Sequence, residues 1–146
     1  MKLQARIRYA VRILVEIGKC PDKLLSLPIV EEKQNISAKY ARQILQPLED
    51  KKIVGSRRGK KGGYFLKKKA SDISLMDVIA ILSENVKIAP CLERPGSCER
   101  EAVCGARPKW TELQSMIEHF FRKTSIQDLI DGEKEVDVAP LNVETL

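Results

Sequence analysis

The chain has 146 residues, of which 43% are hydrophobic and 32% charged, and it carries a formal net charge of +6. This composition predicts a folded protein of one compact domain, or of two small ones that share a core. The opening MKLQARIRYAV places a charge every few positions, which excludes a signal peptide or a membrane span there, and we expect a cytoplasmic protein with reduced thiols and no membrane partner.

The basic residues are concentrated in the first half of the chain. Residues 1–69 hold 18 Lys or Arg and 6 Asp or Glu, a net charge of +12, whereas residues 70–146 hold 8 and 14, a net charge of −6. Nine basic residues and no acidic one lie between Lys51 and Lys69. Binding to nucleic acid is favoured by such clustering, because each neutralised phosphate releases counterions. A solvated basic face without a partner is the alternative, and the clustering argues against it.

The first helix is predicted over residues 3–17. Its apolar residues recur at helical spacing and its other face is basic with Arg6, Arg8 and Arg12. The apolar residues are Leu3, Ile7, Ala10, Val11, Leu14 and Val15.

Two short helices follow, joined by a tight turn. Ser26 is expected to cap a helix that runs to about Gln34, and Asn35 suits the left-handed position at its end. Ser37 is the predicted N-cap of the next helix, in which Pro47 is expected to kink or tighten the last turn. Tyr40, Ile44 and Leu48 would face inward, and Lys39, Arg42, Gln43 and Gln46 would face outward. This pattern is typical of a DNA-binding helix-turn-helix.

The segment IVGSRRGKKGGYFLKK predicts two short strands joined by a basic, glycine-rich turn. The order of residues that a nucleotide-binding P-loop requires is missing from its GKKGG run, so nucleotide hydrolysis is excluded. After a helix-turn-helix, such a hairpin is typical of the wing of a winged-helix domain.

The second half of the chain predicts three more helices. Ser74 and Asp77 form a capping box for a helix through about Glu84, and Ser125 and Asp128 form another for a short helix ending at Gly132. A longer helix starts at Pro108, and its apolar stripe favours a dimer seam over a buried core face. The stripe consists of Trp110, Leu113, Ile117, Phe120 and Phe121. From about Glu133 we expect a mobile tail.

Three of the four cysteines lie in the loop CLERPGSCEREAVC, at Cys91, Cys98 and Cys104. This spacing is too wide for a zinc knuckle and favours an iron–sulfur cluster, whose several irons each take a sulfur. Three unrelated thiols, or a redox pair of Cys91 and Cys98, remain alternatives. His119 and the lone Cys20 are interpreted as ordinary structural residues.

Taken together, the opening MKLQARIRYAVRIL, the wing RRGKKGGYFL, the ISLMDVI helix and the cysteine loop resemble the IscR/NsrR-type winged-helix regulators, a family of bacterial transcription factors. The resemblance implies a mostly α fold with a small β-wing. It also implies a homodimer through a long crossing helix, double-stranded DNA as partner, a [2Fe-2S] or [4Fe-4S] cluster, and control of genes for cluster assembly, iron supply or redox and nitric oxide stress.

The same resemblance assigns residues and regions. The cluster ligands are Cys91, Cys98 and Cys104, and the DNA contacts are Ser37, Lys39, Tyr40, Arg42, Gln43, Arg58, Gly59, Lys60 and Lys61. Residues 1–69 would be the DNA-binding domain, residues 70–132 the cysteine-loop and dimerisation region, and residues 133–146 the tail.

The chain departs from the family pattern in two respects, the fourth cluster ligand and one residue of the recognition helix. Arg107 stands where some members have a histidine ligand, and Arg8 and Arg12 stand where others have a ligand from the partner's first helix. The fourth cluster position is therefore expected to be weak or exchangeable, filled by solvent, a small thiol or Glu101. Arg42 replaces a glutamate that IscR-like members carry, which should change base preference.

Three other functions compete with a cluster-sensing regulator. A metal-free thiol sensor would use the same three cysteines through disulfide or nitrosation chemistry. An electron-transfer protein would have no use for the basic half. An enzyme fits least, because no base and nucleophile stand at a useful spacing.

Overall fold

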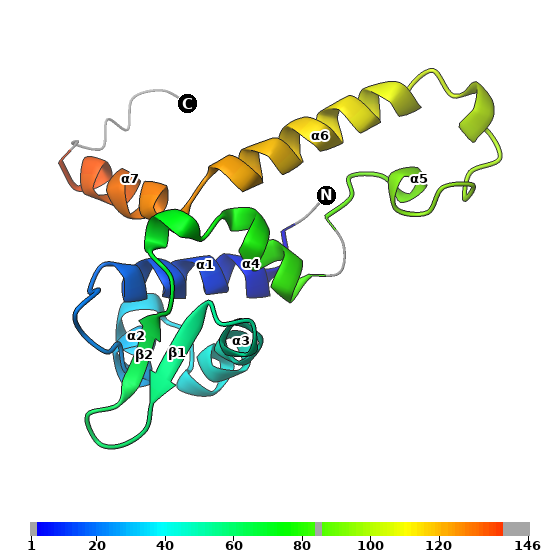
Figure 1. Cartoon of the computed structure of the whole chain (residues 1–146). Helices are drawn as coiled ribbons and strands as arrows, with labels where there is room; N and C mark the ends of the chain where they lie inside the picture. Colours follow the sequence, from blue (N-terminus) through cyan, green and yellow to red (C-terminus); the bar gives the residue numbers. More distant parts are fainter. Residues whose placement is uncertain (1–2, 84–85, 139–146) are drawn as a thin grey trace.

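The computed structural model describes residues 3–83 and 86–138 and is mostly helical with one small sheet (Figure 1). The elements are α1 (Ala5–Gly18), α2 (Leu27–Gln34), α3 (Ala38–Asp50), β1 (Val54–Arg57), β2 (Gly63–Leu66), the 3₁₀ turn η1 (Ala70–Asp72), α4 (Leu75–Leu82), α5 (Pro90–Glu93), the 3₁₀ turn η2 (Glu101–Val103), α6 (Arg107–Lys123) and α7 (Ile126–Val138). Within these residues no helix is long and apolar enough to cross a membrane.

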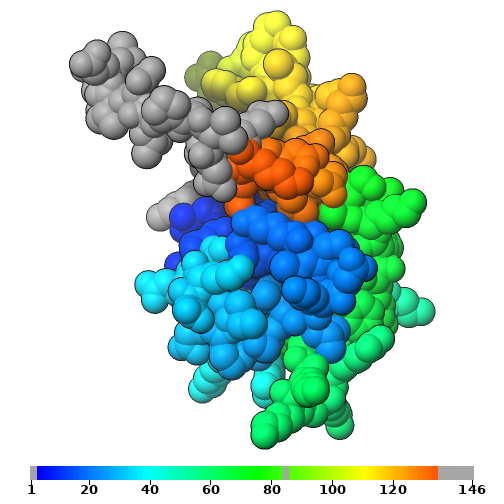
Figure 2. Space-filling model, turned by 90° about the vertical axis from the view of Figure 1, so that its left-hand side faces the viewer, coloured from blue at the N-terminus to red at the C-terminus, as the bar shows by residue number. Residues whose placement is uncertain are grey.

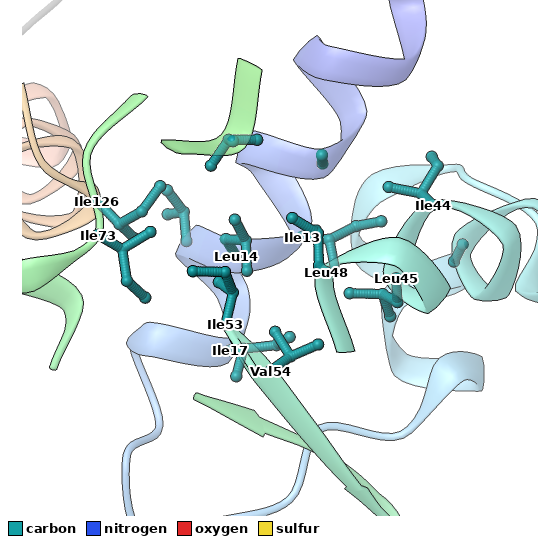
Figure 3. Close-up of a cluster of buried hydrophobic side chains, with 14 of the residues drawn as sticks. Ile13, Leu14, Ile17, Ile44, Leu45, Leu48, Ile53, Val54, Ile73 and Ile126 are labelled. Atoms are coloured by element: carbon teal, nitrogen blue, oxygen red, sulfur yellow. The ribbon is translucent and has the colours of Figure 1, made fainter. Parts of the chain in front are cut away.

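Helix α1 lies at the centre of the core. It contacts α2, α3, α4, α7 and β2. Its Ile13 and Leu14 are fully buried among side chains from both halves of the chain (Figure 3). Ile44 and Leu48 of α3 lie on one side, and Ile73 and Ile126 lie on the other. The two halves therefore share one hydrophobic core.

The helix-turn-helix forms as the sequence predicts. Asn35 takes the left-handed conformation at the end of α2, with φ of 53°. The hydroxyl of Ser37 accepts the Tyr40 N–H at 3.3 Å and caps α3. Ser26 stands at the N-cap position of α2, but its side chain makes no capping bond. Helix α3 continues through Pro47 to Asp50.

The wing consists of β1 and β2, paired antiparallel from Val54 opposite Leu66 to Arg57 opposite Gly63. Leu25, in the connection from α1 to α2, adds a bridge through two 2.9 Å backbone bonds with Tyr64. A Cβ on Gly63 would lie 2.7 Å from the Leu25 carbonyl oxygen, a contact that other residues cannot make without moving the backbone. This close approach explains a glycine before Tyr64.

The second half confirms both capping boxes and corrects one helix end. Ser74 and Asp77 exchange bonds at the start of α4, as do Ser125 and Asp128 at the start of α7. Helix α7 does not end at Gly132, as expected from the sequence, but continues to Val138. Residues 139–146 lie outside the described part of the chain, as does Glu84, the expected end of α4.

Packing against α1 accounts for the longer α7. Gly132 lies inside this helix, and a glycine there costs about 1 kcal/mol relative to alanine, which the contacts with α1 must offset. Here Ile126 and Ile130 are buried, and Lys19, the residue that follows α1, pairs with Glu133 beyond the glycine. Figure 2 shows α7 resting on α1, with the wing projecting from the opposite end of the molecule.

Candidate nucleic-acid interface and cysteine loop

Most of the residues assigned to DNA recognition are exposed on α3. Lys39, Arg42 and Gln43 lie on its outer side, and Ser37 is exposed at its N-cap. Tyr40 differs from them, since it is half-buried and its ring meets Tyr9 edge-on, with the centroids 6.0 Å apart. The structure therefore brings four of the five to one accessible face.

The wing tip presents the other assigned residues. Arg58, Gly59, Lys60 and Lys61 are all exposed, and Gly59 has a φ of 113°, which favours glycine. Behind them the Arg57 guanidinium lies 5.8 Å from the centre of the Phe65 ring. This cation–π contact fixes a further positive charge beside the tip.

A groove of about 470 Å³ separates the wing from α3. Arg42 and Gln46 line it from the helix, and Arg57 and Arg58 line it from the wing. Across the groove the hydroxyl of Ser56 donates to Glu49 at 2.6 Å. This bond ties β1 to the end of α3, so the wing and the helix keep a fixed spacing.

A second hollow, of about 450 Å³, lies on the other side of α3. Arg42 and Gln46 line this hollow too, together with Arg6 of α1 and Gln43. The guanidinium of Arg6 donates to the backbone oxygen of Gln43 at 3.5 Å. The exposed part of α3 is therefore a crest with one hollow on each side.

The cysteine loop is organised by Glu101 and lies at the start of α6, on the side of the molecule away from the wing (Figure 1). One Glu101 oxygen accepts the N–H of Gly96 at 2.6 Å, and the other pairs with Arg107 at 2.7 Å. The Nε of Arg107 is buried without a hydrogen-bond partner. These bonds hold both ends of the segment between Gly96 and Arg107.

The three loop thiols are free and accessible. Cys91 and Cys104 are half-buried and Cys98 is exposed. Thiolates are the usual protein ligands of iron–sulfur clusters, so the donor types suit such a cluster. Over residues 3–83 and 86–138, however, no three Cys, His, Asp or Glu side chains are grouped to hold a metal ion. In this conformation the loop does not gather the thiols.

The apolar stripe predicted on α6 is divided between two faces. Phe121 is buried and Ile117 is half-buried against the core. Trp110, Leu113 and Phe120 are exposed by 45%, 41% and 61%, and Met116, which was not part of the predicted stripe, is exposed by 64%. On the inner side Gln114 is 5% exposed, accepts the Ile88 N–H at 2.9 Å and donates to the Val86 carbonyl at 3.3 Å.

Comparison with known proteins identifies the family. The sequence model of Rrf2, described as an iron-dependent transcriptional regulator, matches residues 3–132. The chain belongs to the Rrf2 family. IscR of Photorhabdus laumondii is 31% identical over 140 residues, which are 95% of this chain and 85% of that protein. The protein rrf2 of Nitratidesulfovibrio vulgaris is 32% identical over 143 residues, which are 97% and 93% of the two chains.

Solved structures of Rrf2-type regulators share the fold. CymR, the global cysteine regulator of B. subtilis, superposes with a TM-score of 0.77 at 25% identity, covering 90% of this chain and 98% of CymR. IscR of T. potens gives 0.76 at 22% identity, covering 96% and 93%. These similarities confirm the resemblance and the mostly α winged-helix fold.

One buried feature of this Rrf2-family chain was missed from the sequence. Glu16 of α1 is 5% exposed and accepts bonds from Lys19 at 2.9 Å, Gln34 at 3.0 Å and Lys33 at 3.4 Å. Burial by itself would raise the pKa of Glu16, but the hydrogen bonds and charges of Lys19 and Lys33 outweigh it, and the pKa is lowered. A lone acid in the apolar run ILVEIG was the available signal. The hydrogen bonds of Glu16 with Lys33 and Gln34 fix the end of α2 against α1.

Proposed function

We propose that this chain is a dimeric regulator that binds pseudo-palindromic double-stranded DNA through α3 and the wing. The observation that carries the proposal is that Arg42 of α3 and Arg58 of the wing line one groove, with Gln43 exposed on the same helix and Lys61 exposed on the same wing. An α-helix fits the major groove, and flanking cations neutralise phosphates. Residues 1–69 form the DNA-binding region in this proposal, and residues 70–132 the sensing and dimerisation region.

The exposed side of α6 supports the dimer. Trp110, Leu113, Met116 and Phe120 form an apolar row on a helix that extends from the body of the protein (Figure 1). A continuous exposed apolar row of this kind is typical of an interface. A second copy packed on this row would place two recognition helices for two half-sites, about one turn of DNA apart.

The sensing role is assigned to Cys91, Cys98 and Cys104. In the first form of the proposal these thiolates hold an iron–sulfur cluster, which when bound supplies redox and nitric oxide reactivity. Gathering them requires the loop to rearrange. Glu101 completes the site only by leaving Gly96 and Arg107, which supports a weak or exchangeable fourth ligand.

A second form uses the thiols without metal. It is favoured by the three free thiols, each at least partly accessible and not gathered in the described conformation. CymR of Staphylococcus aureus, 25% identical with a TM-score of 0.70, has been solved in an oxidized form. Disulfide or sulfenic acid formation at such thiols is reversible and suits a sensor.

Purification without oxygen distinguishes between the two forms of the proposal, the cluster sensor and the thiol sensor. Iron and acid-labile sulfide in stoichiometric amounts support the cluster. A metal-free protein that reacts reversibly with peroxide and changes its DNA affinity supports the thiol sensor. The DNA-binding proposal is tested by selecting sequences from a random duplex library, where a protein that enriches none would contradict it.

A further inference from the structure

The crest of α3 is formed by two residues that belong to both of the hollows beside it. Arg42 and Gln46 line the groove toward the wing and also the hollow toward α1. Gln43, in contrast, lines only the hollow toward α1. If α3 enters the major groove with a DNA backbone in each hollow, the crest residues face the base edges. Gln46 then lies one turn beyond Arg42 at the centre of the contact.

The amide of Gln46 is held by Asp50 on the following turn. Its Nε2 donates to the Asp50 carboxylate at 3.1 Å. A carboxylate only accepts hydrogen bonds, so the nitrogen of the amide must be the atom that faces Asp50. One N–H and the Oε1 of Gln46 are left for a ligand. Adenine presents the complementary N7 acceptor and N6 donor in the major groove.

Asp50 has a second effect on the same surface. Its exposed carboxylate lines the hollow that also holds Arg6. A negative charge in that position repels the phosphates of every DNA sequence equally. The pair would therefore lower overall affinity while fixing the orientation of one base-reading group.

We propose that Gln46 reads a base pair in each half-site, with adenine preferred, and that Asp50 acts as a positioning residue that presets the Gln46 amide. This inference rests on the proposed DNA-binding function. It adds two residues to the recognition surface beyond Arg42 and Gln43.

The test uses the full-length protein and the duplex that the wild type selects from a random library. Affinities for this duplex and for its single-base-pair variants are measured for Gln46→Ala, Asp50→Asn and Asp50→Ala. Asp72→Asn, in η1 away from α3, is the charge-matched control. Circular dichroism confirms that each variant keeps its helices.

The expected results differ between the variants. Gln46→Ala loses about tenfold discrimination at one base pair of each half-site and keeps it elsewhere. Asp50→Asn binds all duplexes more tightly and keeps the pattern, because the asparagine carbonyl still accepts from Gln46. Asp50→Ala also binds more tightly but loses discrimination at the Gln46 base pair. Asp72→Asn changes affinity far less than Asp50→Asn.

Two outcomes overturn the inference while the proposed function stands. If the Gln46→Ala variant discriminates at every base pair as the wild type does, Gln46 does not read a base. If the Asp50→Ala variant keeps full discrimination, Asp50 does not preset the Gln46 amide. A wild type that selects no sequence contradicts the proposed function itself, and the inference with it.

Discussion

Arg6 donates to the carbonyl of Gln43, the acceptor that has no N–H donor four residues further along α3 because Pro47 occupies that position. The N–H that would close this turn of the helix is missing, and a guanidinium from α1 takes its place at 3.5 Å. Helix α3 thereby continues to Asp50 without an unsatisfied carbonyl at Gln43. The contact also anchors α3, the proposed recognition helix, to α1.

This relationship predicts coupling between Arg6 and Pro47. Arg6→Ala should lower the free energy of unfolding by about 0.5–1.5 kcal/mol, the usual worth of one hydrogen bond. In a Pro47→Ala background the loss should shrink toward zero, because an alanine in place of the proline supplies the missing N–H. Urea titrations of the two single variants and the double variant measure the coupling. Arg8→Ala, an exposed arginine of α1, is the control, and equal losses in both backgrounds would contradict the coupling.

The wing tip should contribute charge without base preference. Arg58→Ala combined with Lys61→Ala should weaken binding to all duplexes and lower the slope of log affinity against log salt by about two. Lys67→Ala with Lys68→Ala removes the same charge at the base of the wing and should change the slope less. Fluorescence anisotropy at several salt concentrations gives both slopes. An unchanged slope in the tip variant would exclude the tip from the interface.

The buried Glu16 predicts a pH-dependent contribution to stability. Its pKa is lowered in the folded state, so the folded protein binds this proton less readily than the unfolded chain does. The contribution is therefore present above the unfolded pKa, near 4.5, and is lost as the pH falls through the folded value. Glu16→Gln should cost roughly 1–2 kcal/mol at pH 7, and the difference should shrink in acid.

Urea titrations at pH 7 and below pH 4 check the Glu16 prediction. Glu32→Gln, on the exposed side of α2, is the matched control and should change little at either pH. A Glu16→Gln effect that is the same at both pH values would show that the carboxylate charge does not stabilise the fold.

The sequence was sufficient where a feature depends on neighbours along the chain. The Ser37 cap, the left-handed Asn35 and the two capping boxes all follow from spacing within one turn. The basic hairpin tip also follows from local composition.

Features that depend on distant neighbours were missed or wrong. The stripe on α6 divides because Phe121 faces the core while Phe120 faces outward, which the spacing of one helix cannot decide. Helix α7 passes Gly132 because α1 lies against it. The role of Glu101 required knowledge of how the cysteine loop folds back on Arg107.

The loop cysteines should act as one set, separate from Cys20. Replacing Cys91, Cys98 or Cys104 by Ala should abolish cluster assembly, because each thiolate supplies one ligand. Cys20 lies outside the loop, so the Cys20→Ala variant should still assemble the cluster. Iron, acid-labile sulfide and the visible spectrum after reconstitution without oxygen measure this. A cluster lost in the Cys20 variant would show that a ligand has been misplaced.

Cluster loading should also change DNA affinity. The loop joins α4, which packs on the core, to the proposed dimer helix α6, and a shift of a few kcal/mol between two helix orientations suffices for a large change in affinity. Loaded and cluster-free protein compared on one duplex without oxygen test this coupling. Equal affinities would refute it.

The most direct test of the account is whether the protein reads a two-fold DNA site as a dimer through α6. Binding to the selected pseudo-palindromic duplex is compared with binding to a duplex in which one half-site is scrambled, with sedimentation velocity on the same samples. We expect a dimer that binds the intact site at least tenfold more tightly, and we expect Met116→Ala with Phe120→Ala to dissociate the dimer and remove that advantage. Thr111→Ala, on the polar side of α6, should leave both unchanged. A monomer that binds single and paired half-sites equally well would contradict the account.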